Sequence, residues 1–223
     1  MNGDIGDRVD FIRANTRLQA PPHVPEISLH LADEAMDLWK LTESELETLG
    51  LPLPFWAFAW AGGQALARHV LDHPETVAGR TVLAFAAGAG LEAIAAVKSG
   101  AARVLATEID PFALTALELN AGMNGVSIEI SGLDVLEGGL ASLPFRPETV
   151  LLGDVFFERP LADRVAAFAA SCVDEGILVL VGDPGRSYLP SDRMETLAEY
   201  RVPTTRALED AEVKKTRVWR FLG

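Results

Sequence analysis

Two apolar segments joined through a glycine turn constrain the fold of this chain more than any other feature. Residues 81–86 form an uninterrupted apolar run, the turn Gly88-Ala89-Gly90 follows, and residues 91–98 have a helical pattern. Residues 103–107 form a second strand-like run that ends at Glu108, twenty residues after Gly88. Apolar runs of this kind are typical of strands buried in a parallel sheet. The layout predicts a doubly wound sheet that holds a small adenosine-containing molecule on its first turn.

The rest of the chain continues this alternation. Further strands are predicted over 126–130, 148–153 and 176–182, and helices over 65–71, 111–123 and 161–172. Strands that alternate with helices form a parallel sheet with helices on both faces. After a short helix predicted over 194–200, residues 201–208 and 214–222 are predicted to pair as an antiparallel C-terminal hairpin. The predicted fold class is α/β, a seven-stranded, mostly parallel Rossmann-like sheet similar to that of class I S-adenosylmethionine-dependent methyltransferases.

The length of 223 residues suits one domain with an appended segment. A short helix is predicted over 8–18 and a short strand over 27–31, followed by an acidic stretch over 33–49 that Pro52 and Pro54 close. We therefore divide the chain into an N-terminal leader, residues 1–50, and a methyltransferase domain, residues 51–223.

Charge and composition limit the classes of partner that this protein is expected to bind. The formal net charge of −13 disfavours nucleic acid, because phosphate neutralisation needs Lys and Arg, and it suits a basic, lysine-bearing protein face. We expect a cytoplasmic protein without membrane contact, since neither a secretory signal nor a membrane-length apolar run is present. One cysteine, Cys172, allows no disulfide framework, and the four histidines lack ligand spacing, so no metal site is predicted.

The cofactor is predicted to lie along the carboxyl ends of the first three strands. Gly88 and Gly90 let the backbone approach a ligand closely, although a tight turn needed only for packing would use the same residues. Glu108 is placed to accept hydrogen bonds from both ribose hydroxyls, with Ile109 beside it. Asp134 and the backbone N–H of Val135 could bind adenine, but an ordinary loop acid is an equally good interpretation of Asp134.

The chemistry is predicted at the end of the fourth strand. Asp154 follows that strand, so it should lie near the transferring methyl group and orient an amine. Phe156 and Phe157 could wall a lysine channel, because aromatic faces attract ammonium groups, or they could be core residues. Trp60 and Gly62 precede the helix that is predicted to pack beside the cofactor turn, so we expect one tryptophan to cover the ligand.

Five sequence blocks resemble the electron transfer flavoprotein β-subunit lysine methyltransferase family. They are residues 55–66, the turn at 88–90, Glu108-Ile109-Asp110-Pro111, residues 151–157 and Gly182-Asp183-Pro184-Gly185-Arg186. The likeness runs from about residue 25 to residue 219. It implies S-adenosylmethionine as cofactor and S-adenosylhomocysteine as product, with Trp60 and the Gly62 region on the cofactor, Glu108 on the ribose and Asp154 at the methyl-transfer site. It also implies that lysines of the β subunit of electron transfer flavoprotein are the substrate.

Two departures from the family pattern concern the site. The family's first strand usually ends in an Asp-Leu-Gly-Ser-Gly type turn, and Ala84 and Ala86 stand here at the acid and first glycine positions. An acid there often orders the loop or the methionine amino group, so reduced cofactor affinity or replacement by other groups is expected. The family's Phe-Tyr pair is Phe156-Phe157 here, which removes a phenol.

Three other functions fit parts of the sequence. The cofactor half would look similar in a methyltransferase that acts on a ribosomal protein or a small amine. Ala84 and Ala86 are compatible with a catalytically silent S-adenosylmethionine-binding module. The strand–turn–acid layout is shared with NAD-dependent oxidoreductases, whereas NADP is disfavoured because no basic residue lies near Glu108.

Overall fold

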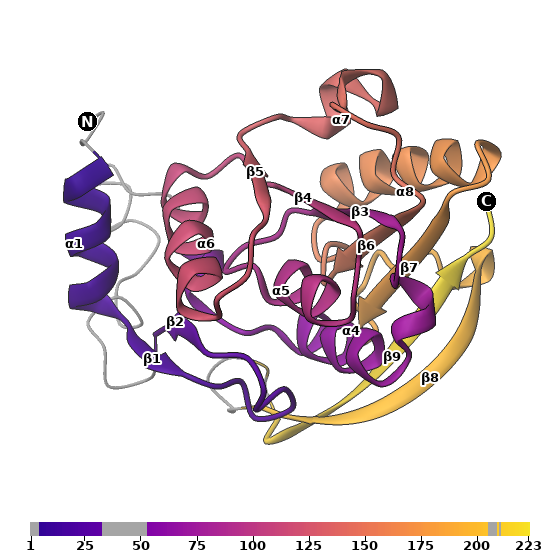
Figure 1. Cartoon of the computed structure of the whole chain (residues 1–223). Helices are drawn as coiled ribbons and strands as arrows, with labels where there is room; N and C mark the ends of the chain where they lie inside the picture. Colours follow the sequence, from indigo (N-terminus) through magenta and orange to yellow (C-terminus); the bar gives the residue numbers. More distant parts are fainter. Residues whose placement is uncertain (1–4, 33–52, 205–208, 210) are drawn as a thin grey trace.

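A computed structural model describes residues 5–32, 53–204, 209 and 211–223 of the chain. Its main sheet has seven strands in the order β5-β4-β3-β6-β7-β9-β8. Strands β3 to β7 are parallel, whereas β9 is antiparallel to both of its neighbours, β7 and β8 (Figure 1). The mostly parallel sheet with an antiparallel C-terminal hairpin is therefore confirmed. The strands are β3 (Thr81–Phe85), β4 (Arg103–Thr107), β5 (Glu129–Ser131), β6 (Thr149–Gly153), β7 (Leu178–Asp183), β8 (Met194–Pro203) and β9 (Val213–Phe221).

Helices cover both faces of this sheet, and each face has its own apolar core. On one face Val82, Leu151 and Leu180 pack with residues of α4 (Ala61–Asp72), α5 (Leu91–Lys98) and α6 (Pro111–Met123). On the other face Leu83, Leu152 and Val179 pack with residues of α8 (Arg159–Asp174), next to the short helix α7 (Val135–Gly138). Strand residues alternate between the two cores because successive side chains point to opposite faces.

Local sequence signals explain why the elements around the first turn begin where they do. The Asp110 side chain accepts a hydrogen bond from the Phe112 N–H at 2.8 Å, and Pro111 occupies the first turn of α6. Gly90 precedes α5 in the left-handed conformation, with φ of 89°. The predicted segments 91–98, 103–107 and 111–123 coincide with α5, β4 and α6, because each has its own start and stop signals.

The helix predicted over 194–200 is wrong: these residues belong to β8, which is ten residues long. Glu195 and Glu199 lie on this edge strand, and each faces a cation on β9. Glu195 is close to Arg220, and Glu199 is close to Lys215. Residues such as Met, Glu, Leu and Ala favour helices, but pairing with a neighbouring strand overrides this weak propensity. The strand predicted over 201–208 is described only as far as residue 204.

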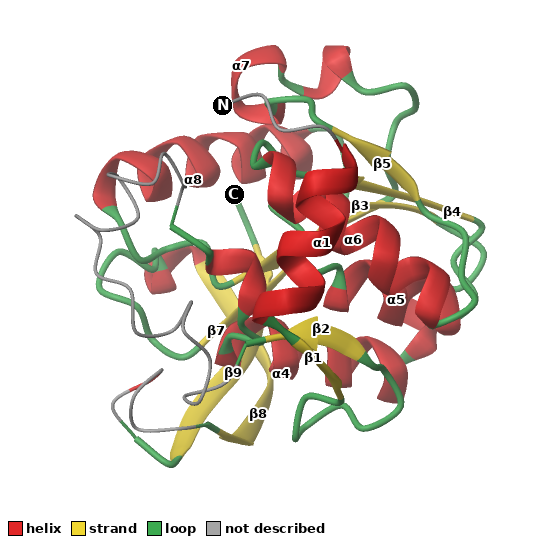
Figure 2. Ribbon diagram, turned by 90° about the vertical axis from the view of Figure 1, so that its left-hand side faces the viewer, coloured by secondary structure: helices red, strands yellow, loops and turns green. Residues whose placement is uncertain are grey.

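The N-terminal elements pack against α6. Helix α1 (Ile5–Asn15) lies beside α6 in both ribbon views (Figures 1 and 2), with the Phe11 and Phe112 rings 5.1 Å apart. Strands β1 (Arg17–Gln19) and β2 (Leu29–Leu31) pair antiparallel, and the His30 N–H donates to Oδ1 of Asn120 at 2.8 Å. The acidic stretch 33–49, Pro52 and the boundary at residue 50 lie outside the described residues, so the leader segment stays a prediction.

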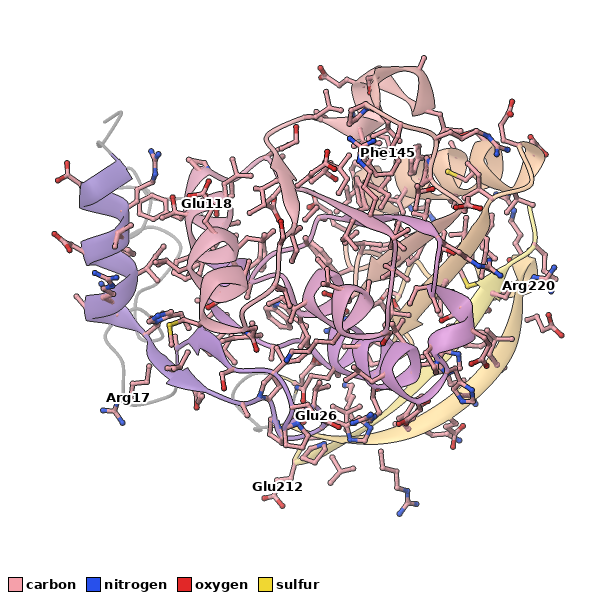
Figure 3. The ribbon with its side chains drawn as sticks, viewed as in Figure 1. Arg17, Glu26, Glu118, Phe145, Glu212 and Arg220 are labelled. Atoms are coloured by element: carbon pink, nitrogen blue, oxygen red, sulfur yellow. The ribbon has the colours of Figure 1, made fainter. Side chains whose placement is uncertain are left out.

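Many charged side chains lie at the surface of the molecule. The labelled side chains of Arg17, Glu212 and Arg220 lie at the periphery of the ribbon (Figure 3). Among the described residues, no helix combines the length and apolar character needed to cross a bilayer.

Candidate active site

A cavity of about 800 Å³ opens where β3, β4 and β6 end. Its walls come from segments far apart in the sequence: residues 53–60, the turn 86–89, the ends of β4 and β5, and the loop after β6. This volume lies in the usual range for small-molecule sites, and the position obeys the rule that open parallel sheets bind ligands at strand carboxyl ends.

At one end of the cavity, Glu108 is held by backbone N–H groups. Its Oε2 accepts from Gly88 at 3.1 Å, and its Oε1 accepts from Ile109 at 2.8 Å and from Asp110 at 3.4 Å. Burial raises the pKa of Glu108, although these hydrogen bonds oppose the shift. Beside it the buried Thr107 hydroxyl has no hydrogen-bond partner in the described structure. The remaining lone pairs of Glu108 and the Thr107 hydroxyl suit a ligand with hydroxyl groups, such as a ribose.

The glycine turn itself adopts the left-handed conformation at three positions. The φ angles are 48° at Ala86, 51° at Gly88 and 89° at Gly90. Gly90 does not line the cavity, and a Cβ there would lie 3.1 Å from Cγ of Leu117, so this glycine serves helix packing. Ala86 takes a glycine-like conformation in spite of its Cβ, which costs about 1–2 kcal/mol.

Asp134 and Val135 line the cavity beyond β5. Asp134 caps α7, because its Oδ1 accepts from the N–H of Leu136 at 2.9 Å, and its Oδ2 lies 3.7 Å from Arg164. Leu133 and Leu136 add apolar wall on either side, as a purine ring requires. The capping role is thus present, and the adenine contact of Asp134 and Val135 stays a prediction.

At the other end of the cavity, Asp154 is fixed by three groups. Its Oδ2 accepts from the Gly62 N–H at 2.8 Å, its Oδ1 accepts from Nε of Arg186 at 2.6 Å, and its own N–H donates to the Gly182 carbonyl at 2.9 Å. Its φ of 74° is a left-handed, strained conformation for a residue with a side chain. Gly62 does not line the cavity, and it acts on the site by orienting Asp154.

Arg186 joins Asp154 to two further buried acids. Its Nη2 donates to Oε1 of Glu209 at 2.8 Å, and its N–H donates to Oδ1 of Asp183 at 2.7 Å. Burial opposes the charge on Arg186, but Asp154 and Glu209 hold its pKa above the usual value. Burial, followed by repulsion from Asp154, raises the pKa of Asp183 to about 7. The sequence signalled Arg186 only through the Gly-Asp-Pro-Gly-Arg block, and nothing in the sequence singled out Glu209.

Three aromatic rings line the cavity near Asp154. The Phe55 and Phe157 rings are 5.4 Å apart, the Phe55 and Trp60 rings 6.1 Å, and the Arg186 guanidinium lies 5.8 Å from the Trp60 ring. Phe55 and Phe157 are 47% and 41% exposed, so they form part of an accessible surface.

Phe156 does not share this position. Its side chain is fully buried in the core against α8 and does not line the cavity, so the expectation that it walls a lysine channel is corrected. The two phenylalanines follow the end of β6, and the chain turns one of them towards α8 and the other towards the cavity.

The donor set fits S-adenosylmethionine better than a metal. No cluster of three or more His, Cys, Asp or Glu that could hold a metal ion occurs within the described ranges. The cavity instead offers a carboxylate and an unpartnered hydroxyl for a ribose, apolar residues for a purine, and a second carboxylate ringed by aromatic side chains.

Comparisons with known proteins agree with this geometry. A family model for ribosomal protein L11 methyltransferase (PrmA) matches residues 65–155. The electron transfer flavoprotein beta subunit lysine methyltransferase of Danio rerio is 36% identical over 98% of this chain and 85% of its own length. The protein of the same name from Homo sapiens is 32% identical over 95% of this chain and 80% of its own length.

A solved structure supports the fold. The crystal structure of SMU.776, a methyltransferase complexed with SAH, matches with a TM-score of 0.55 at 10% identity, over 87% of this chain and 53% of that chain. At that identity the likeness concerns the fold alone. The two relatives are similar over nearly the full length, which also covers both carboxylate ends of the cavity. This chain therefore belongs to the electron transfer flavoprotein beta subunit lysine methyltransferase family.

Proposed function

We propose that this protein transfers a methyl group from S-adenosylmethionine to lysine side chains of the beta subunit of electron transfer flavoprotein. The observation that carries the proposal is the likeness, over nearly the full length, to relatives named for that reaction. The cavity adds support, because a charged residue and three aromatic rings surround the end at which an amine would enter.

The residues at the β4 and β5 ends would hold the cofactor, whose sulfonium supplies an electrophilic methyl group. Glu108 would accept hydrogen bonds from the ribose hydroxyls, because its carboxylate is already oriented by the backbone. Leu133 and Leu136, which line the cavity, would pack against the adenine ring. The turn that contains Gly88 lets the backbone approach the rest of the ligand.

The residues at the β6 end would position the lysine. Phe157 and Trp60 flank its aliphatic stem and attract its ammonium head. After the ammonium loses a proton to solvent, Asp154 accepts a hydrogen bond from the neutral amine and aligns its lone pair with the methyl carbon. The N–C bond would form as the C–S bond breaks and S-adenosylhomocysteine leaves, and alignment at short distance is the main requirement of such a displacement.

The substrate is tested by transfer of a radiolabelled methyl group from S-adenosylmethionine. The purified protein is incubated separately with the beta subunit of electron transfer flavoprotein, with ribosomal protein L11 and with a free small amine. We expect label in the beta subunit alone, at lysines found by mass spectrometry. Label in L11 or the small amine alone would favour those substrates, and no transfer to any acceptor would favour a silent binding module.

Calorimetry separates this proposal from an oxidoreductase. We expect the protein to bind S-adenosylmethionine and S-adenosylhomocysteine and not NAD. Binding of NAD alone would contradict the cofactor. A cytoplasmic location and the lack of nucleic-acid and membrane partners stay predictions, which cell fractionation and binding to DNA, RNA and vesicles would test.

A further inference from the structure

Glu92 is an acid in the cavity wall to which the proposed reaction assigns no role. It lies in the first turn of α5, directly after the glycine turn, and it lines the cavity. The first turn of a helix favours a negative side chain, yet this position faces a largely apolar interior. Burial raises the pKa of Glu92 to about 7, and repulsion from Asp154 adds to the shift.

Two glycines make space for its carboxylate. A Cβ on Gly63 of α4 would lie 2.7 Å from Oε1 of Glu92, and a Cβ on Gly153 of β6 would overlap the same atom. Glu92 therefore reaches from α5 across to the end of the central strand β6, next to Asp154. Any larger residue at position 63 or 153 would displace the carboxylate.

The other acids that line the cavity already have partners. Glu108 and Asp110 accept backbone N–H groups, Asp134 caps α7 and faces Arg164, and Asp154 pairs with Arg186. Within the described part of the chain, Glu92 makes no ion pair, and its carboxylate is hydrogen-bonded only to its own backbone N–H. A half-buried carboxylate that faces an apolar cavity without a cation is unfavourable, so this position is completed when a ligand brings a positive charge.

The placement of the cofactor indicates which charge that is. With the ribose at Glu108 and the sulfonium near Asp154, the amino-acid arm must lie along the glycine turn and the start of α5, where Glu92 stands. The end of β3 offers no acid for this arm, because the residue at position 84 is an alanine that is buried in the core. We propose that Glu92 binds the ammonium group of the methionine arm of S-adenosylmethionine.

The proposal rests on the cofactor of the proposed function and is tested by binding alone. Wild-type protein and Glu92→Gln are titrated with S-adenosylhomocysteine and with 5′-methylthioadenosine, which keeps the adenosine and the thioether but lacks the amino-acid arm. Because Glu92→Gln would weaken a hydrogen bond to a charged group, it should lower the affinity for S-adenosylhomocysteine by about tenfold to a hundredfold. The affinity for 5′-methylthioadenosine should change by less than about twofold.

The matched control is Glu118→Gln, which removes an exposed acid from α6 (Figure 3). It should leave the affinity for both ligands unchanged. Equal losses for the two ligands in Glu92→Gln, or no loss for S-adenosylhomocysteine, would overturn the role of Glu92. Wild-type protein that binds neither ligand would overturn the cofactor assignment as well, whereas failure to methylate the beta subunit would affect only the proposed substrate.

A measurement on wild-type protein covers the case in which Glu92→Gln does not fold. The ligands are S-adenosylhomocysteine and its analogue without the α-amino group. The affinity ratio of the two should increase between about pH 6 and about pH 7.5, as Glu92 loses its proton. The charged groups near this region are Glu108, Asp154, Asp183, Arg186 and Glu209. Because burial also raises the pKa of Asp183 to about 7, the titration is repeated with Asp183→Asn, in which the increase of the ratio with pH should remain. An increase that disappears in Asp183→Asn would assign the pH dependence to Asp183. A ratio that is constant with pH would contradict the proposal.

Discussion

Glu108 and Asp154 are carboxylates in the wall of one cavity, after β4 and β6 respectively, and they are held in different ways. Glu108 accepts hydrogen bonds from backbone N–H groups of its own strand end and of the glycine turn beside it. Asp154 is held by the Gly62 N–H from α4 and by the Arg186 side chain from the loop after β7. The Glu108 end of the cavity, which we propose holds the ribose and call the ribose end, is thus built by one strand–turn–helix–strand unit. The Asp154 end, which we propose for the reaction and call the methyl-transfer end, depends on several distant segments.

This difference predicts how a substitution at each end affects ligand binding, activity and stability. A change at Glu108 removes ligand contacts but leaves its neighbouring backbone in place. A change at Asp154 removes one carboxylate partner of Arg186, and a change at Arg186 leaves the buried Asp154 and Glu209 without their counter-ion. The methyl-transfer end should therefore respond in both activity and stability, and the ribose end mainly in binding.

The largest effect is expected for Asp154→Asn. Loss of the carboxylate that orients the amine should lower the rate of methyl transfer by about a hundredfold or more. Affinity for S-adenosylhomocysteine should stay within about threefold, because Asp154 acts on the amine. The exposed control Asp163→Asn on α8 should keep the wild-type rate. A rate for Asp154→Asn equal to wild type would show that Asp154 is not part of the chemistry.

Arg186→Met should destabilise the fold by about 3 kcal/mol, because Asp154 and Glu209 would lose their buried counter-ion. Urea unfolding measures the loss. The control Arg220→Met breaks an exposed pair with Glu195, at 3.9 Å, and should cost less than about 1 kcal/mol. Similar costs for both variants would mean that the Arg186 pair adds no more than a surface pair.

Glu108→Gln should lower the affinity for S-adenosylhomocysteine by about tenfold, since a neutral amide accepts hydrogen bonds from ribose hydroxyls less well than a carboxylate. Calorimetry on the variant and on Glu129→Gln, an exposed control on β5, gives the comparison. Unchanged affinity in Glu108→Gln would place the ribose elsewhere in the cavity.

Ala86→Gly should raise the free energy of unfolding by about 0.5–1 kcal/mol, because glycine adopts the observed φ of 48° without strain. Ala87→Gly is the matched control, since Ala87 has no positive φ and is buried. It should instead destabilise the protein by a similar amount. If both variants are destabilised equally, the turn is not strained at Ala86.

The sequence by itself determined the ribose end. The strand, the turn at Gly88–Gly90, helix α5, strand β4 and Glu108 follow one another within thirty residues, and the N-cap Asp110 with Pro111 sets the start of α6. Start signals, stop signals and periodicity act between near neighbours, so they can be read without knowing the rest of the fold. The spacing of twenty residues between Gly88 and Glu108 predicted a cofactor site, and in the structure the Gly88 N–H donates a hydrogen bond to Glu108.

Only the tertiary structure decided the methyl-transfer end. Residues 194–203 became a strand because β9 lies beside them, and Phe156 and Phe157 separated because α8 buries one of them. Asp154 was visible as a strand-end acid, but Gly62 and Arg186 reach it from 92 and 32 residues away. Such partners are chosen by how strands and helices pack, and packing depends on contacts between segments that no local pattern encodes.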